Sequence, residues 1–230
     1  MGAKMTANDS PGNRDAASGR RHSRWPALFA LLALGGLYAA LPPSLVLGGP
    51  RWLLLLLISL LLIPMLISHF RGDHITNQVL GYVLNSLVTL AMIISLALLI
   101  LALPAHLEKP QELLRSAAAL WLSNILVFAS WYWRLDAGGP HKRAQRGDHA
   151  SGAFLFPQMT LPPEKKHAAG FQEWSPNFVD YLFLAFNTST AFSPTDVPVL
   201  SRWAKLLMML QSIISLLVIA LLAARAVNIL

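Results

Sequence analysis

Five apolar runs, each close to the length that crosses a lipid bilayer, dominate this sequence. They cover about residues 26–47, 52–69, 79–104, 113–133 and 204–227. A membrane helix needs about 20 consecutive, mostly apolar residues. The second run, WLLLLLISLLLIPMLISHF, is interrupted only by Pro64, which membrane helices tolerate as a kink. The runs predict an all-helical polytopic membrane protein with about five transmembrane helices.

The amino-acid composition restricts the kinds of chemistry that the protein can perform. Only 13% of the 230 residues are charged, against about 25% in an average soluble domain. The chain has no cysteine, so disulfides, thiolate catalysis and cysteine-bound metal are excluded. Its histidines form no pair at helical ligand spacing within the predicted helices, and no glycine-flanked nucleophile turn is present. We expect no metal, no cofactor and no enzymatic activity.

The sequence divides into four parts. Residues 1–25 form a basic tail expected to be disordered, and 26–133 hold four transmembrane helices. Residues 134–175 form a polar connecting loop, in which GAFLFPQM is the only apolar piece. Residues 176–230 hold a short helix, a polar turn and the final transmembrane helix.

The distribution of lysines and arginines predicts the orientation of the protein in the membrane. With the N-terminus inside, most of the 18 lysines and arginines lie on the cytoplasmic side, and the exceptions are Arg51, Lys109, Arg115 and Arg225. Positive loops favour the cytoplasm, so the N-terminus is predicted to be cytoplasmic in a bacterial inner membrane. The same distribution explains the net charge of +7 without a nucleic-acid partner.

The stretch WSPNFVDYLFLAF predicts a helix that cannot span the membrane. Ser175 is expected as its N-cap and Pro176 at its first position. A helix over 176–188 would be about 20 Å long, whereas the hydrocarbon layer is about 30 Å thick. The chain is therefore expected to turn back inside or at the edge of the membrane.

The turn that follows, in FNTSTAFSPTDVP, carries the polar groups that backbone at this depth requires. Unpaired amides and carbonyls must face protein or a wet cavity, because lipid cannot satisfy them. The available groups are those of Thr188, Ser189, Thr190, Ser193, Thr195 and Asp196. Two interpretations stay open: an ion or solute pathway, or an interfacial helix and loop that seals the bundle and carries nothing.

The segment from FVDYLFLAF to the C-terminus resembles the pore half of simple potassium channels. The matching features are Asp180 and Tyr181 in the pore helix, the hydroxyl residues Thr188–Thr190, and Asp196 with Pro198 after the turn. The glycine-aromatic-glycine filter of those channels is absent, and residues 191–194 read AFSP instead. The resemblance implies a pore loop, although those channels receive theirs from outside.

Most of the chain resembles a bacterial family of uncharacterised five-helix integral membrane proteins. The shared features are Gly138–Pro140, Phe154–Gln158, Asp180–Tyr181, Thr195–Asp196 and Ala226–Asn228. This resemblance implies the five-helix plan and supplies no activity.

The sequence therefore predicts a channel-like passive conductor of monovalent cations, embedded in the lipid bilayer and assembled as a homo-oligomer. The alternative is a non-transporting membrane scaffold or stress-related protein. The expected pore or filter residues are Thr188, Ser189, Thr190, Phe192, Ser193, Thr195 and Asp196, and the expected pore-helix residues are Asp180 and Tyr181.

Overall fold

The computed structural model describes residues 25–46, 50, 52–71, 73–102, 110–146, 152–171, 174–192 and 196–227. Over these residues the chain is helical, and its one extended pairing is an isolated antiparallel bridge between Phe154 and Val199. The all-helical prediction is confirmed for this part of the chain. The predicted basic tail lies outside the described residues apart from Trp25.

Within the described residues, five helices are long and six helical segments are short. The long ones are α1 (Trp25–Ala39), α2 (Leu53–Phe70), α3 (His74–Ala102), α4 (Pro110–Leu135) and α9 (Arg202–Val227). The short ones are η3 (Pro43–Leu45), η4 (Asp136–Gly138), α5 (Pro140–Arg146), α6 (Pro157–Thr160), α7 (Pro163–Ala168) and α8 (Phe178–Ala191).

Among the described helices, three are long and apolar enough to cross a membrane. The qualifying stretches are Ile75–Ala102, Gln111–Gly138 and Arg202–Ala224. α1 and α2 are apolar but shorter, over Ala30–Ala39 and Leu53–Ser68. α1 ends before Pro42 and Pro43, where the chain enters a 3-10 turn, because proline cannot continue a helix.

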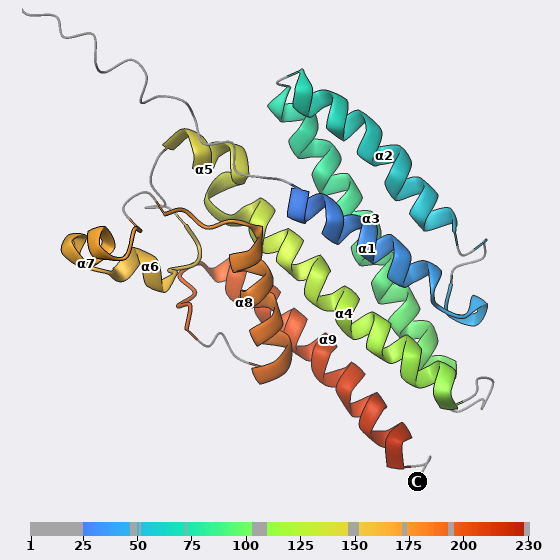
Figure 1. The fold of residues 1–230 in the computed structure, drawn as a ribbon. Helices are drawn as coiled ribbons and strands as arrows, with labels where there is room; N and C mark the ends of the chain where they lie inside the picture. Colours follow the sequence, from blue (N-terminus) through green and yellow to red (C-terminus); the bar gives the residue numbers. More distant parts are fainter. Residues whose placement is uncertain are drawn as a thin grey trace, which may run out of the picture.

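α4 lies at the centre of the molecule and packs against α1, α3, α8 and α9. α2 contacts α1 and α3 on one side, whereas α8 and α9 cover the opposite side (Figure 1). The short helices α5, α6 and α7 gather at the end where α4 finishes and α8 and α9 begin. The predicted connecting loop is therefore built largely from short helices.

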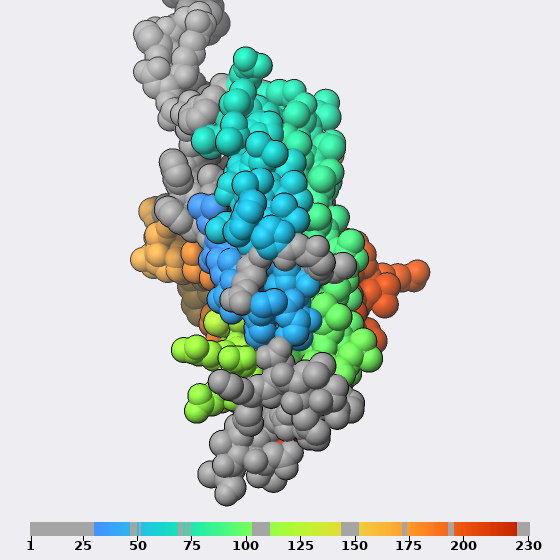
Figure 2. All heavy atoms as spheres, turned by 90° about the vertical axis from the view of Figure 1, so that its right-hand side faces the viewer, coloured from blue at the N-terminus to red at the C-terminus, as the bar shows by residue number. Residues whose placement is uncertain are grey.

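The outer faces of the helices are apolar. Figure 2 shows the face made by α1, α2 and α3. On α2 the exposed side chains include Leu53, Leu56, Leu60, Ile63 and Ile67. Exposed leucines and isoleucines repeated along a helix are costly in water and favourable in lipid, so this face has the chemistry of a membrane-facing surface.

Gly81 allows α3 and α4 to approach each other around a buried arginine. Arg134, near the end of α4, is only 5% exposed. A Cβ atom added at Gly81 would lie 1.7 Å from Nη1 of Arg134 and 2.4 Å from its Cζ. The guanidinium therefore rests directly on the α3 backbone, which only glycine permits.

We expect Gly81→Ala to destabilise the protein by about 1–3 kcal/mol, the usual effect of overpacking a well-packed site. Gly36→Ala is the control, because a Cβ there meets nothing within 4 Å and alanine is the better helix former. Thermal unfolding in detergent measures both. Equal melting temperatures for the two variants would show that the Gly81 contact does not constrain the packing.

Candidate functional site: the polar seam between α4, α8 and α9

α8 begins with a reciprocal cap. The Asn177 side chain accepts a hydrogen bond from the Val179 amide (2.8 Å), and the Asp180 carboxylate accepts one from the Asn177 amide (2.7 Å). Burial raises the pKa of the Asp180 carboxyl, and the hydrogen bond from the Asn177 amide opposes that shift. The expected cap at Ser175 is wrong: the helix starts two residues later, where this capping box satisfies its first amides.

α8 and α9 lie side by side and run in the same direction. Gln211 of α9 donates hydrogen bonds from Nε2 to the Ala185 carbonyl (2.7 Å) and the Ser189 hydroxyl (2.8 Å). One turn further along both helices, the Ser215 hydroxyl donates to the Ser189 carbonyl (3.0 Å). Residues four apart on α8 thus meet residues four apart on α9, which fixes the helices in parallel register.

α4 completes this network from the other side. The Tyr132 hydroxyl donates to Oε1 of Gln211 (2.5 Å), and Nδ2 of Asn124 donates to the Gln211 carbonyl (3.3 Å). All of these side chains are fully buried. We call the five residues that meet here, Asn124, Tyr132, Ser189, Gln211 and Ser215, the polar seam.

A second cluster lies at the end of α4, around the buried Asp136. Its Oδ2 accepts a hydrogen bond from the Tyr181 hydroxyl (2.6 Å), and its Oδ1 accepts one from the Ala153 amide (2.5 Å). Nη1 of Arg143 donates to the carbonyls of Asp136 (2.7 Å) and Trp133 (2.8 Å). α4, the connecting segment and α8 are therefore joined at one carboxylate.

Tyr181 is a hydrogen-bond donor in this cluster. Burial raises the pKa of its phenol well above the ordinary value, and the negative charge of Asp136 acts in the same direction. The guanidinium of Arg143, with Cζ 5.1 Å from the ring centroid of Tyr181, acts in the opposite direction. The phenol stays protonated and donates a hydrogen bond to the carboxylate.

Phe154, a residue of the connecting segment, packs in the hydrophobic core. Its side chain is 1% exposed, and its ring lies 5.2 Å from that of Tyr132, 6.2 Å from Tyr181 and 6.1 Å from Trp203. Its backbone pairs with Val199 on the return path from α8. The apolar piece GAFLFPQM is thus part of the hydrophobic core, which the sequence did not predict.

The expected pore residues do not share one environment, because some are buried and others are exposed. Thr188 and Ser189 are fully buried, whereas Thr190, Phe192 and Asp196 are exposed. The hydroxyls of Thr188 and Thr190 donate to carbonyls one turn earlier in α8, at 2.8 and 3.0 Å. Ser193 and Thr195 lie outside the described residues.

Both expected pore-helix residues lie in the first turn of α8. Asp180 forms part of the cap, and Tyr181 points to Asp136. The sequence analysis did not predict the partners that Asn124, Gln211 and Asp136 have in this structure. A polar residue in an otherwise apolar helix was the available signal for Gln211, but nothing local indicated its partners.

No group of three or more His, Asp or Glu side chains is placed to hold a metal ion within the described ranges. The polar seam and the Asp136 cluster are chemically suited to hold helices together. The bonds of the seam join neutral donors and acceptors. In the Asp136 cluster a carboxylate accepts from a phenol and an amide, and the Arg143 guanidinium donates to two carbonyls.

The fold and these clusters define an all-helical protein with three helices able to cross a membrane, and a half-length helix bound between two of them. No family model, no curated protein and no solved structure matches the chain. The resemblances to the five-helix family and to potassium channels stay predictions.

We expect Gln211→Leu to loosen α8, because the hydroxyls of Ser189 and Tyr132 would lose their buried partner. Each unsatisfied buried group costs about 1–3 kcal/mol. The measurement is proteolysis of the detergent-solubilised protein, with cleavage near α8 expected to rise at least several-fold. Ser212→Ala, on the same turn and half-buried, is the control and should leave cleavage unchanged. Wild-type cleavage in Gln211→Leu would show that the seam does not hold α8.

Proposed function

We propose that the protein is an integral membrane protein with five spanning helices and a re-entrant hairpin made of α8 and its return segment. The proposal of a hairpin rests on one observation: α8 and α9 start at the same end of the molecule and run parallel. The chain must therefore return to its starting level between them. The bridge from Val199 to Phe154 lies on that return path.

The length of α8 supports the same proposal. Its 14 residues extend about 21 Å at 1.5 Å per residue, which is less than the bilayer core of about 30 Å. In the register of the polar seam, the end of α8 at Ala191 is level with Leu217, beyond the midpoint of α9. The tip of the hairpin thus lies deep within the helical layer.

The side from which the hairpin enters follows from charge. The basic helix α5, with Lys142 and Arg143, lies at the end where α8 starts. Positive residues favour the cytoplasm. In this proposal the N-terminus and the hairpin entrance are cytoplasmic, and the membrane is a bacterial inner membrane.

Passive conduction of monovalent cations is the activity that the tip supports best. The C-terminal end of a helix carries partial negative charge, and here it points into the helical layer. Thr190 and Phe192 at the tip and Asp196 just beyond it are exposed. Several copies of the chain around an axis would be needed to bring such tips together into a conduction path.

The second candidate, a non-transporting scaffold, is favoured by a different observation. The hydroxyls of Thr188 and Ser189 are used inside the protein, so the buried part of the hairpin serves packing. A scaffold would keep the hairpin and conduct nothing.

Single cysteines test the hairpin, since the chain has none of its own. We expect Glu164→Cys and Leu200→Cys to react with an impermeant maleimide from one side of the membrane and Ala224→Cys from the other. Met209→Cys, on an exposed apolar face, is the control and should react from neither side. Labelling of positions 164 and 200 from opposite sides would mean that α8 spans, and the hairpin would be wrong.

Ion flux separates the two candidate functions. Purified protein in liposomes should carry K⁺ or Na⁺ down a gradient faster than empty liposomes do, and Asp196→Asn should lower that rate several-fold by removing a negative charge that attracts cations to the return segment. Glu164→Gln, an exposed carboxylate on α7, is the matched control. Flux at the empty-liposome level for both ions rejects the conductor and leaves the scaffold.

A further inference from the structure

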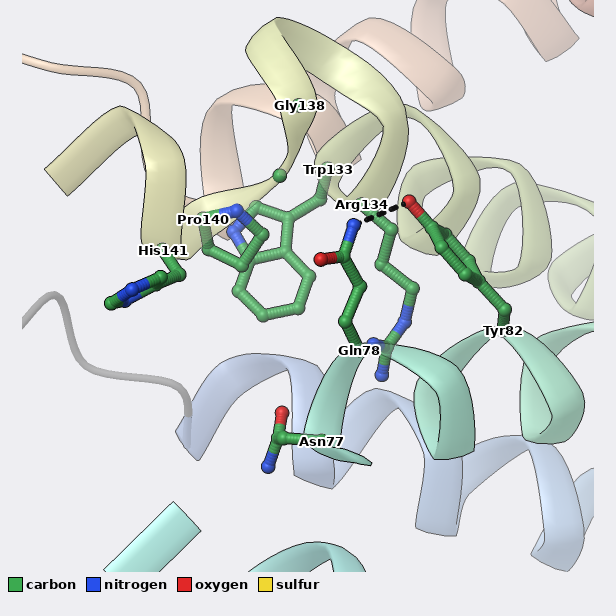
Figure 3. A pocket seen from close by; sticks show the side chains of 9 residues that line it. Asn77, Gln78, Tyr82, Trp133, Arg134, Gly138, Pro140 and His141 are labelled. Carbon is green, nitrogen blue, oxygen red and sulfur yellow. Dashed lines mark hydrogen bonds between the residues drawn. The ribbon is translucent and has the colours of Figure 1, made fainter. Parts of the chain in front are cut away.

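A pocket lies between the first turns of α3, the end of α4 and the start of α5 (Figure 3). The pocket is small, with room for water-sized groups over about 30 Å³, and it is open at its mouth. The lining residues are Asn77, Gln78, Tyr82, Trp133, Arg134, Gly138, Gly139, Pro140 and His141. Neither candidate function uses this pocket.

Among the residues that the structure describes, the lining is rich in hydrogen-bond donors and includes no carboxylate. Amide, guanidinium, imidazole and indole groups can all donate, and the guanidinium carries a permanent positive charge. At the mouth, Gln78 and His141 are half-buried, and Nε2 of Gln78 donates to the Tyr82 hydroxyl (3.0 Å). A ligand with several acceptor oxygens and negative charge matches this set.

The glycine turn keeps the pocket open. Gly138 and Gly139 have φ values of +79° and +97°, a region that side chains disfavour. A Cβ atom at Gly139 would lie 3.0 Å from the Arg134 carbonyl and 3.8 Å from Nε2 of Gln78. A larger residue would therefore be strained and would occupy the space beside Gln78.

Arg134 places a positive charge behind the pocket wall. Its side chain is held between the Gly81 backbone and the Trp133 ring, with Cζ 5.6 Å from the ring centroid. Because it is 5% exposed, water screens its charge weakly, and an anion in the pocket would feel it more strongly than at an open surface. The arginine attracts the ligand by charge, while Gln78 and His141 are placed to touch it.

We propose that this pocket binds a phosphate group, and that its source is the headgroup of an anionic phospholipid. The location favours a lipid: the pocket lies where α3 begins and α4 ends, at the level where a spanning helix leaves the hydrocarbon, and Tyr82 and Trp133 are the aromatic residues typical of that depth. Inorganic phosphate shares the chemistry and differs only in arriving from water.

The test measures lipid retention by the full-length protein in detergent, by native mass spectrometry with added phosphatidylglycerol or phosphatidylcholine. We expect phosphatidylglycerol to be retained in preference. Gln78→Glu, which keeps the side-chain shape and adds a negative charge, and Arg134→Met, which removes the positive charge, should each weaken retention about fivefold or more. Gln111→Glu, exposed near the start of α4 at the opposite end, is the matched control.

A second arm identifies the source of the phosphate. Melting temperature is measured in lipid-free detergent with and without inorganic phosphate, for the wild type and for Gln78→Glu. Stabilisation of the wild type alone by phosphate, without selective lipid retention, supports a phosphate site supplied from water. Selective lipid retention supports the headgroup. If wild type and Gln78→Glu respond equally to both ligands, the pocket is no phosphate site, whatever the folding of Arg134→Met.

Discussion

The arrangement of α4, α8 and α9 depends on the hydrogen bonds of the Gln211 side chain. Its amide donates to the Ala185 carbonyl and the Ser189 hydroxyl of α8 and accepts from Tyr132 of α4. In a layer with no water, a glutamine must find protein partners, and this one has both ends of its amide satisfied. Apolar packing alone would let α8 slide along α9, since leucines accept many registers. The directional bonds allow one register and so determine how deep the half-length helix reaches.

Asp136 performs the corresponding role at the end of the bundle. A buried carboxylate is costly unless it is hydrogen-bonded and near positive charge. Here it accepts from Tyr181 and from the Ala153 amide, and Arg143 bonds to its backbone carbonyl. Those three partners come from α8, the connecting segment and α5. The order of these segments around the end of α4 is thus specified by charge and hydrogen bonding, whereas the order of the long helices is specified by apolar contact.

The sequence predicted the features that depend on local pattern. Runs of apolar residues placed α2, α3, α4 and α9 within a few residues of their observed bounds, and the short length of α8 was evident from the polar residues that follow it. The start of α8 was missed by two residues, because the reciprocal bonds of Asn177 and Asp180 outweigh the preference of Ser175 for a cap position. Partners distant in sequence were not predictable. Nothing near Phe154 indicates that it fills a space between Tyr132 and Trp203, and nothing near Ser189 indicates Gln211.

The pairing of Phe154 with Val199 has a mechanical consequence. The amide of Leu155 donates to the Pro198 carbonyl, and that of Leu200 donates to the Ala153 carbonyl. The segment before α9 is therefore tied to the segment whose Phe154 ring packs against Tyr132 and Trp203. A displacement of residues 153–155 is transmitted through these two hydrogen bonds to residues 198–200. The packing of the Phe154 ring among its aromatic neighbours resists such a displacement, so it restrains both chain segments at once.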